Sequence, residues 1–357
     1  MPDTVFCLLP VASCLQKLIT DYLLLITENI MPKVTVCIPT YNRADYLSYS
    51  INSVLRQTYE DFELIVCDDG SSDHTPEVVA AFRDSRIIYL RHPQNLGRSL
   101  NMRSGFTAAR GEYFIKFDDD DGLTPEFLAK TVPILDQEKK VDFVCTDHWI
   151  IDKFGQKVAS ATQENSAKWG KDRLQQGIIT DLERQTFYYQ SLQVGSTLFR
   201  YQSLADVDYM RSPADGCEDF DLLVRLALAG KQAYFLPELL MEYRFHGGQT
   251  SLKQAVHFLQ AKLFCTESYH FNDLKLEEER VKKAAFLQES LGIKLIEKGE
   301  TEAGRVLIEK ASQLLGKSRR ARLGLLLSYL PLNLRQLAFQ GFRQLRSKDY
   351  AEQVRAV

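Results

Sequence analysis

Residues 33–136 alternate between two patterns of apolar positions, which predict strands and helices in turn. Short apolar runs rich in β-branched side chains predict buried strands, and apolar residues three and four positions apart predict helices. Short connections indicate a parallel sheet covered by helices on both faces. The predicted strands cover residues 34–39, 62–67, 87–90 and 113–117, and the predicted helices cover 44–57, a segment through 78–82 with Asp73 as N-cap, 100–109, and a segment with Thr124 as N-cap and Pro125 in first position.

Polar loops follow three of the four predicted strands, at residues 39–43, 68–73 and 118–121. In a parallel sheet the carboxyl ends of the strands meet at one edge, and ligands bind in the crevice there. We therefore expect these loops to face one crevice. Neither Gly-x-Gly-x-x-Gly nor Gly-x-x-x-x-Gly-Lys-Ser/Thr occurs in the chain, so Rossmann dinucleotide binding and P-loop nucleotide binding are disfavoured.

Four consecutive carboxylates, Asp118 to Asp121, follow the fourth strand and are closed by Gly122. Like charges at the end of a buried strand repel one another, so the cluster is costly without a countercharge. A divalent cation takes carboxylate oxygens as ligands and would bring a phosphate with it. The alternative is a solvated acidic turn beside a helix start, where carboxylates interact well with the helix dipole. The convergence of three polar loops favours the cation.

The composition narrows the class of protein. A chain of 357 residues has room for about two domains. The net charge of −3 argues against a general nucleic-acid binder. Seven scattered cysteines without a Cys-x-x-Cys pair favour a reducing cytosol and argue against a structural zinc site. Cys37, Cys67 and Cys145 lie in apolar runs, where cysteine behaves as a small buried hydrophobe.

Residues 1–30 precede the first strand. Their apolar runs are interrupted by Lys17 and Asp21, so none is long enough to span a bilayer. No basic residue precedes Lys17, which argues against a signal peptide. We expect Met31 to be the true start and residues 1–30 to be an extension outside the native product. A short membrane-surface anchor is the alternative.

Five motifs stand in the order and spacing of a known family. They are Pro39-Thr-Tyr-Asn-Arg43, Cys67-Asp-Asp-Gly-Ser-Ser-Asp73, Asn95-Leu-Gly97, Ala109-Arg-Gly-Glu-Tyr113 and Phe117-Asp-Asp-Asp-Asp121. Together they closely resemble the family 2 glycosyltransferases, and the resemblance covers about residues 33–250. It implies a GT-A fold, which is an α/β fold with a mainly parallel, Rossmann-like sheet flanked by helices. Here an all-helical C-terminal extension would follow it.

This resemblance implies that the crevice binds a nucleotide-diphosphate sugar. Asp68 occupies the position that contacts the base, typically uracil, and residues 39–43 form part of the nucleotide wall. Asp118 and Asp120 match the family's Asp-x-Asp, which holds a divalent cation (Mn²⁺ or Mg²⁺) on the diphosphate. Asn101-Met102-Arg103 departs from the family's usual Arg-Asn, which leaves the roles of Arg98 and Arg103 near the phosphates or ribose open. The predicted nucleotide-sugar-binding residues are Pro39, Thr40, Tyr41, Arg43, Asp68, Asp69, Asn95, Gly97, Arg98, Asp118, Asp119 and Asp120.

Two further motifs resemble the second half of the family's domain. Gly195 to Arg200 resembles its central strand under the donor sugar, with Ser196 on the acceptor side. Cys217 to Leu226 resembles its Glu-Asp motif at a helix start. By this resemblance Asp219 is the base that takes the proton of the acceptor hydroxyl, and Glu218, on the acceptor side, and Asp221 are weaker candidates. Alternatively, Glu218 and Asp219 merely stabilise a helix N-terminus.

His246 stands before two glycines, so its backbone can approach a ligand closely. We expect either a third metal or phosphate ligand here, beside Asp118 and Asp120, or an ordinary loop histidine. Residues 156–190 have no clear periodicity. By the resemblance, this segment shapes the acceptor site.

The chain turns helical after Leu252. Amphipathic patterns predict a helical hairpin of residues 276–298 and 301–315. Residues 317–348 carry eight basic side chains, no acid and many leucines. Such a segment suits either an anionic membrane surface or a helical cap with a solvated basic face. We predict an N-terminal extension (1–30), a catalytic domain (31–250) with a nucleotide-binding half (31–136) and an acceptor half (137–250), and a helical C-terminal region (251–357).

The sequence thus predicts an inverting, metal-dependent, non-processive glycosyltransferase of cell-envelope or exopolysaccharide synthesis. Its donor would be a nucleotide-diphosphate sugar, most simply a UDP-sugar, and its acceptor a saccharide, a lipid-linked glycan or a protein. We expect a cytoplasmic protein, with peripheral contact at the inner face of the cell membrane through its basic helices as an open question. The alternatives are a nucleotidyltransferase that forms sugar nucleotides and a catalytically inactive scaffold that docks on membranes or partner enzymes.

Overall fold

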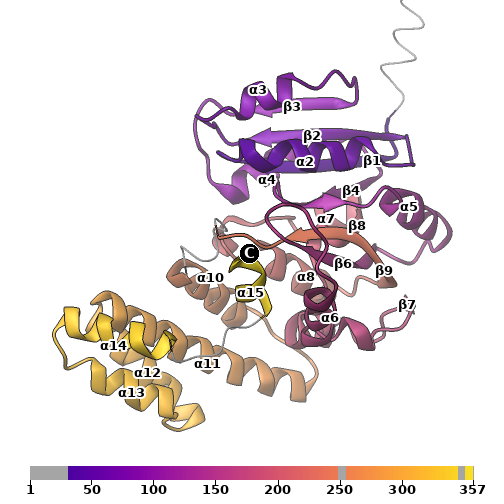
Figure 1. The fold of residues 1–357 in the computed structure, drawn as a ribbon. Helices are drawn as coiled ribbons and strands as arrows, with labels where there is room; N and C mark the ends of the chain where they lie inside the picture. The colour runs from indigo at the N-terminus through magenta and orange to yellow at the C-terminus, as the bar shows by residue number, and fades with distance from the viewer. Residues whose placement is uncertain (1–30, 248–254, 345–349, 357) are drawn as a thin grey trace, which may run out of the picture.

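The computed structural model describes residues 31–247, 255–344 and 350–356, and it shows an α/β part followed by a helical part (Figure 1). Three expectations fall outside the described residues. They concern the extension at 1–30, the predicted start of the helical region within residues 248–254, and the basic residues Arg346 and Lys348.

The elements of the described chain are as follows. The strands are β1 (Val34–Thr40), β2 (Phe62–Asp68), β3 (Ile87–Arg91), β4 (Tyr113–Lys116), β5 (Gly122–Leu123), β6 (Phe143–Ile151), β7 (Gly177–Ile178), β8 (Thr197–Arg200) and β9 (Ala233–Arg244). The helices are α2 (Ala44–Leu55), α3 (Thr75–Ala80), α4 (Arg98–Ala108), α5 (Phe127–Gln137), α6 (Ala159–Lys168), α7 (Tyr201–Ala205), α8 (Glu218–Leu228), α10 (Ala255–Ser268), α11 (Leu274–Lys298), α12 (Thr301–Leu315), α13 (Arg319–Leu327), α14 (Leu332–Gln344) and α15 (Tyr350–Ala356). Four short helical turns are η1 (Lys171–Arg173), η2 (Arg184–Tyr189), η3 (Val194–Ser196) and η4 (Ser212–Ala214).

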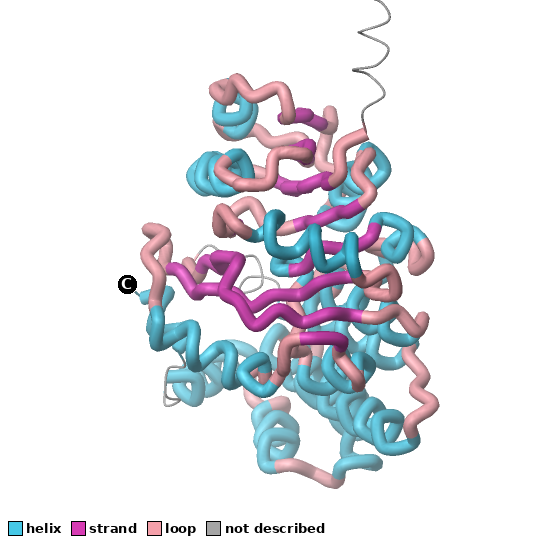
Figure 2. The backbone as a smooth tube through the Cα atoms, turned by 90° about the vertical axis from the view of Figure 1, so that its right-hand side faces the viewer, coloured by secondary structure: helices cyan, strands magenta, loops and turns pink. Residues whose placement is uncertain are grey.

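One mixed sheet runs through the described part of the α/β region, in the order β3-β2-β1-β4-β8-β6-β9-β5, with β7 paired to β9 (Figure 2). The pairs β1·β2, β2·β3, β1·β4 and β6·β9 are parallel. Strand β8 is antiparallel to both β4 and β6 and so joins the two halves of the sheet. The predicted fold class is confirmed, and the first half has the alternation of strands and helices that the sequence predicts.

Strand β1 is buried on both faces, as its continuous apolar run predicts. Side chains alternate between the two faces of a strand. Val34, Val36 and Ile38 therefore pack in a cluster with residues of α2 and α5, whereas Cys37 packs on the other face with Cys67 and Met102 of α4. This double burial fixes β1 in the sheet and leaves its carboxyl end to project the polar loop that follows.

Both predicted N-caps are wrong. His74, not Asp73, precedes α3, and the Asp73 carboxylate instead accepts hydrogen bonds from Ala44 N (3.1 Å) and Thr75 N (3.0 Å), which ties the start of α2 to the start of α3. Thr124 lies before α5, whose first residue is Phe127. The reason is β5, because its antiparallel pairing with β9 keeps the chain extended up to Thr124. That long-range pairing leaves no local signal in the sequence.

The predicted C-terminal hairpin is confirmed as α11 and α12, joined at Gly299, which has a φ of 103°. Helices α13 and α14 pack on this hairpin (Figure 1). Arg335 does not belong to a solvated basic face, because it is 6% exposed and its guanidinium donates to the carbonyl oxygens of Ile296, Ser328 and Leu330. The last helix, α15, returns to α6, where the Tyr350 hydroxyl donates to Asn165 Oδ1 at 2.7 Å.

The hairpin provides a test of packing. Helices α11 and α12 touch at Gly292 and Gly304, and a Cβ on Gly292 would meet the Gly304 carbonyl oxygen at 2.6 Å. Because backbone must move to relieve this contact, we expect Gly292→Ala to lower the free energy of unfolding by about 1–3 kcal/mol, measured by urea denaturation. Gly341→Ala in α14 is the control, since a Cβ there meets nothing within 4 Å. Equal stability of the two variants would contradict this packing.

Candidate active site

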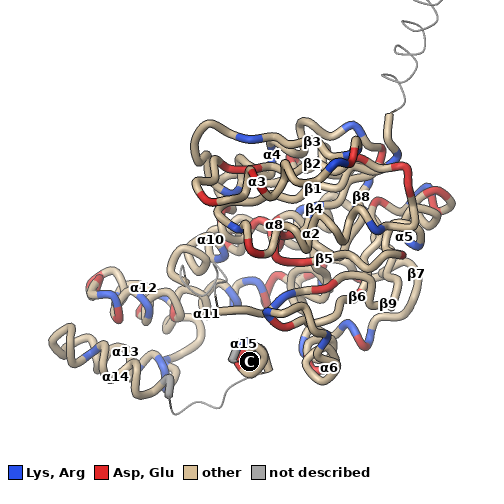
Figure 3. Tube along the Cα trace, turned by 45° about the horizontal axis from the view of Figure 1, so that its top comes forward, with Lys and Arg blue, Asp and Glu red and all other residues tan. Residues whose placement is uncertain are grey.

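The acidic loop, residues 118–121, lies between β4 and β5 at the carboxyl edge of the sheet, and the trace there and at the nearby start of α8 is coloured red for acidic residues (Figure 3). Asp118, Asp120 and Asp121 each offer one carboxylate oxygen, and these three oxygens lie within 4.8 Å of one another. The sequence analysis placed all four acids in one cluster but assigned the cation to Asp118 and Asp120 alone, because only these two match the family's Asp-x-Asp, so the convergence of Asp121 was not expected.

Two buried side chains hold the backbone of the acidic loop. The Ser50 hydroxyl on α2 lies 2.8 Å from the carbonyl oxygen of Asp119 and 2.7 Å from that of Asp121. Arg244, at the end of β9, donates from Nε to the carbonyl oxygen of Asp120 (2.6 Å) and from its backbone N to Asp121 Oδ1 (2.9 Å). The loop is therefore fixed from two separate elements, so its carboxylates stay close together despite their repulsion.

Besides Arg244, three cationic side chains of the described residues lie within 4 Å of carboxylates of the acidic loop. Lys116 Nζ lies 2.8 Å from Asp118 Oδ1. Arg98 Nη2 is 3.5 Å from that same oxygen, and Arg43 Nη1 is 3.6 Å from Asp120 Oδ2. Arg43 and Arg98 are thus where the sequence analysis expected them, beside the acids. Lys116 was missed, although a lysine in an otherwise apolar strand is itself a signal.

The pKa of the first carboxylate of the acidic loop is lowered, whereas those of Asp119 and Asp121 are raised. Burial alone would raise the pKa of Asp118, but Lys116 and Arg98 together hold that pKa below its usual value. The pKa of Asp119 is raised to about 7 by burial and by the neighbouring Asp120 charge. Burial and Asp120 also raise the pKa of Asp121. The cations therefore compensate the first carboxylate, whereas the rest of the loop still carries unfavourable negative charge.

The donor set of the acidic loop fits a divalent cation. Mg²⁺ and Mn²⁺ prefer carboxylate oxygens, and three such oxygens converge here on a loop whose remaining charge favours a cation. Asp118, Asp120 and Asp121 are the residues that would hold it.

His246 also lies at the acidic loop. Its Nε2 is 2.9 Å from Asp120 Oδ2, and its ring packs 4.7 Å from the ring of Tyr46 on α2. The histidine is 5% exposed, so it is not an ordinary solvent-exposed loop residue. Its role as a metal or phosphate ligand remains a prediction.

The loops after β1 and β2 meet, as expected. Asn42 N donates to Ser71 Oγ at 2.9 Å, and Asp69 N donates to the Thr40 carbonyl oxygen at 3.0 Å. Thr40 is buried at the end of β1, Pro39 is half-buried, and Tyr41 is 46% exposed on the rim. The backbone here thus forms a fixed wall with Tyr41 and Arg43 projecting from it.

Asp68 and Asp69 are engaged within the protein. Asp68 is fully buried, and it accepts hydrogen bonds from Ser71 N at Oδ1 (2.8 Å) and from the Tyr89 hydroxyl at Oδ2 (2.6 Å). Asp69 accepts from Leu96 N (2.7 Å) and Gly97 N (3.1 Å).

The second contact of Asp69 fixes the turn at Asn95–Gly97. The Asn95 side-chain oxygen also accepts from Gly97 N, at 3.1 Å, and Gly97 has a φ of 93°, which favours glycine. Because α4 starts at the next residue, this turn sets the position of Arg98 against Asp118.

The Glu-Asp motif opens α8, as predicted, and its two acids have different surroundings. The side chain of Glu218 is 3% exposed, accepts a hydrogen bond from the Ser99 hydroxyl (3.2 Å), and lies 3.9 Å from Arg98 Nε. The side chain of Asp219 is 38% exposed, and its Oδ1 lies 3.5 Å from Lys116 Nζ. Burial raises the pKa of Glu218, with Arg98 opposing it. Lys116 thus lies between a carboxylate of the acidic loop and a carboxylate of α8.

Three residues that the sequence analysis considered for the site make their contacts outside the acidic loop. Asp221 is fully buried and paired with Arg211 and Arg225, which makes it an anchor of α8. Ser196 is also fully buried, and its hydroxyl donates to the Thr146 carbonyl oxygen at 3.0 Å inside the sheet. Arg103, whose role was open, pairs with Asp208 at 2.9 Å, away from the acidic loop.

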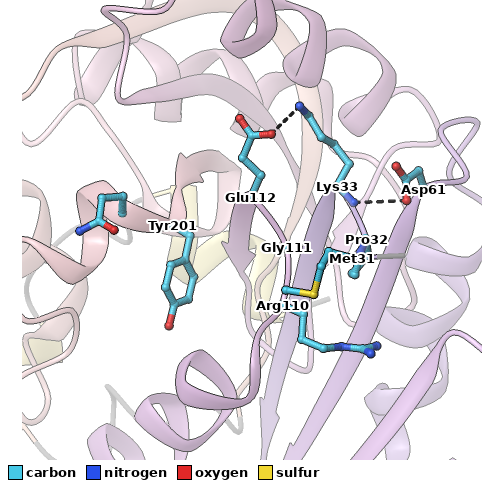
Figure 4. A pocket seen from close by; sticks show the side chains of 9 residues that line it. Met31, Pro32, Lys33, Asp61, Arg110, Gly111, Glu112 and Tyr201 are labelled. Atoms are coloured by element: carbon cyan, nitrogen blue, oxygen red, sulfur yellow. Dashed lines mark hydrogen bonds and ion pairs between the residues drawn. The ribbon is translucent and has the colours of Figure 1, made fainter. Parts of the chain in front are cut away.

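A separate cavity of about 410 Å³ lies where β1 and β4 begin, at the opposite edge of the sheet from the acidic loop (Figure 4). It is lined by residues that include Lys33, Asp61, Arg110, Glu112 and Tyr201. Its charged groups are paired with one another or with neighbours, as in the contact of Lys33 Nζ with Glu112 at 2.6 Å. The candidate chemistry therefore lies at the acidic loop and not in this cavity.

The family model and the known proteins to which this chain is similar are those of glycosyltransferases. The family model described as "Glycosyl transferase family 2" matches residues 35–193. An uncharacterized glycosyltransferase of Haemophilus influenzae is 27% identical over 230 residues, which are 62% of this chain and 68% of that protein. The hyaluronan synthase of Pasteurella multocida is 25% identical over 63% of this chain but only 22% of its own length.

Solved structures share the fold. S. aureus TarS 1-349 in complex with UDP-GlcNAc has a TM-score of 0.59 at 18% identity, covering 87% of this chain and 92% of its own. The mannosyltransferase PcManGT from Pyrobaculum calidifontis, in complex with GDP-Man and Mn²⁺, has a TM-score of 0.54 at 14% identity, covering 90% and 89%. Residues 35–193 are therefore a family 2 glycosyltransferase domain, and the chain is a glycosyltransferase with the GT-A fold.

Proposed function

We propose that the protein is an inverting, metal-dependent, non-processive glycosyltransferase that uses a UDP-sugar. The observation that carries this proposal is the junction at Lys116, which brings Asp118 of the acidic loop and Asp219 of α8 to one ammonium group. A site for the leaving diphosphate and a base for the acceptor are thereby adjacent. Adjacency of this kind is what a single displacement at a sugar carbon requires.

Asp219 is the better base of the two acids in its motif. A base must reach the acceptor, and the side chain of Asp219 is 38% exposed whereas that of Glu218 is 3% exposed. Glu218 is also held by Ser99 and faces Arg98. Asp219 would accept the proton of the acceptor hydroxyl as that oxygen attacks the sugar, and one positioned carboxylate suffices for this.

The acidic loop and its cations suit the donor's diphosphate. A divalent cation bound there supplies charge neutralisation for the departing nucleoside diphosphate. Arg43 and Arg98 already lie beside the loop and would bind phosphate oxygens, since guanidinium groups match phosphate geometry. TarS in complex with UDP-GlcNAc and PcManGT in complex with GDP-Man and Mn²⁺ support this assignment.

For the base, Asp68 remains the proposed contact. Its carboxylate is fully buried, accepts hydrogen bonds at both oxygens and faces Arg91 Nε at 3.5 Å, so uracil N3–H would have to displace one of these partners to bind it.

We further propose that α13 and α14 contact an anionic membrane that carries the acceptor. The face of α14 formed by Leu334, Leu337 and Phe342 is exposed, with 62% exposure at Leu337. Lys317, Arg319, Arg320 and Arg322 are exposed at and just before the start of α13, and no acidic residue occurs from Gly316 to Gln344. Apolar side chains with nearby positive charge match a lipid surface of negative charge. No helix in the described residues is long and apolar enough to cross a bilayer.

The cation site is tested by Asp120→Ala. We expect this variant to lose Mn²⁺-dependent UDP binding, because it removes one of three converging carboxylates, and calorimetry measures the loss directly. Glu126→Ala is the control, since the Glu126 side chain is 62% exposed outside the acidic loop and should leave binding unchanged. Unchanged affinity of Asp120→Ala for UDP would refute the site.

The role of Asp219 is tested by Asp219→Asn, which keeps the shape of the side chain but cannot take a proton. We expect UDP binding to persist while transfer, and hydrolysis of the donor sugar in the presence of Mn²⁺, fall by about 10²–10⁴-fold. Release of nucleoside diphosphate by the wild type also distinguishes this enzyme from a scaffold, which releases none, and from a nucleotidyltransferase, which forms pyrophosphate from sugar phosphate and nucleoside triphosphate. Normal turnover of Asp219→Asn would remove Asp219 from the role.

The membrane contact is tested with vesicles. The full chain should co-sediment with vesicles that contain phosphatidylglycerol but not with pure phosphatidylcholine, and added salt should weaken this binding. Leu334→Asp/Leu337→Asp should abolish it, whereas Val306→Asp, which is 62% exposed on α12, should not. Equal binding of both variants would contradict the assignment.

A further inference from the structure

A pair of lysines on the C-terminal helices lies beside the aromatic ring next to Asp219. Lys262 Nζ of α10 is 4.8 Å from the centre of the Phe220 ring, and Lys283 Nζ of α11 is 5.5 Å from it. Lys283 Nζ also lies 4.8 Å from the ring centre of Phe187 in η2. Because both ammonium groups flank one ring, they are no more than about 10 Å apart.

The positive charge of this lysine pair, Lys262 and Lys283, has no acidic partner. Among the described residues no carboxylate oxygen lies within 4.0 Å of either ammonium. Lys262 donates to Gln190 Oε1 and Lys283 to the Phe187 carbonyl oxygen, each at 2.7 Å, so each has one neutral partner in a group that can donate three hydrogen bonds.

Both lysines are partly withdrawn from water. Burial and the neighbouring charge of Lys262 lower the pKa of Lys283 to about 7, and burial lowers the pKa of Lys262. Lys283 is therefore only partly charged at neutral pH when no anion is near, and an anion bound to the pair would favour its charged form. The carboxylate of Asp221 is paired with Arg211 and Arg225, so it does not serve as the anion for the lysine pair.

The lysine pair lies on the side of α8 away from the acidic loop. Asp219 faces Lys116, and Phe220, one position further along the helix, turns by about 100° toward α10 and α11. The hydrogen-bond partners of the two lysines, Gln190 and the Phe187 carbonyl oxygen in η2, belong to the end of the segment 156–190 that the sequence analysis associated with the acceptor. Arg43 and Arg98 lie beside the acidic loop and would bind the diphosphate of the donor. We therefore do not assign the lysine pair to the donor.

We propose that Lys262 and Lys283 form a subsite for an oxyanion carried by the acceptor glycan, a phosphate or carboxylate group on a part of the glycan outside the sugar that receives the transfer. This inference rests on the proposed function and deepens it, because it assigns the acceptor to the anionic glycans. Phe220, whose ring both lysines contact, directly follows Asp219 in α8, so consecutive residues of one helix connect the subsite and the proposed base.

The site is tested first with inorganic phosphate on the full chain saturated with UDP and Mg²⁺, so that the nucleotide site is filled. Exchanging chloride for phosphate at equal ionic strength should raise the melting temperature of the wild type and of Lys282→Met, a matched control on α11 whose lysine pairs with Glu278. The shift should vanish in Lys262→Met/Lys283→Met and persist in Lys262→Arg/Lys283→Arg. A shift that survives in the methionine variant, or is absent from the wild type, overturns the site.

A second measurement needs no variant. Phosphate should slow the acetylation of Lys283 by acetic anhydride, followed by peptide mass spectrometry, and leave the rate at Lys282 unchanged. Equal rates with and without phosphate overturn the site. Because this readout does not depend on nucleotide binding, it can succeed or fail independently of the Asp120→Ala and Asp219→Asn results.

The assignment to the acceptor is tested with paired glycans that differ only in a phosphate or carboxylate group. The wild type should bind the anionic member at least tenfold better, and Lys262→Met/Lys283→Met should lose that preference while it hydrolyses the donor at the wild-type rate. Protection by phosphate without any preference for anionic glycans would mean a site for free anions and would overturn the acceptor assignment.

Discussion

The repulsion within the acidic loop is the constraint on which the rest of the site depends. Four carboxylates remain together because their backbone is held by Ser50 and Arg244 and because Lys116 pairs with the first of them. A buried lysine is costly unless its charge is matched, and Lys116 is matched twice, by Asp118 and by Asp219. The contacts of Lys116 therefore stabilise the acidic loop and also fix its position relative to α8.

Much of the donor half could be predicted from the sequence because its signals are local. Strand periodicity located β1 to β4, and the polar residues directly after each strand gave the loops that meet at the crevice. The sequence did not show Arg244 or β5, because both act through contacts with residues about 120 positions away. The same long-range pairing moved the start of α5 from Thr124 to Phe127.

The acceptor half was harder to predict because it is assembled from distant pieces. Ser196 followed a recognisable motif, yet its hydroxyl is used inside the sheet. Lys262 and Lys283 belong to no motif, and only the packing of α10 and α11 against α8 brings them beside Phe220. Charge in a helical region is ordinarily solvated, so no local pattern distinguishes these two lysines from Lys282, which pairs with acids on its own helix.

The two sides of α8 suggest how one fold can serve different acceptors. On one side, Asp219 contacts Lys116 of the strand that carries the acidic loop, so the proposed base and the proposed cation site share one lysine. On the other side, Phe220 contacts Lys262 of α10 and Lys283 of α11. If Asp219 and the lysine pair have the proposed roles, substitutions in α10 and α11 would change which acceptor binds without changing the residues around the acidic loop.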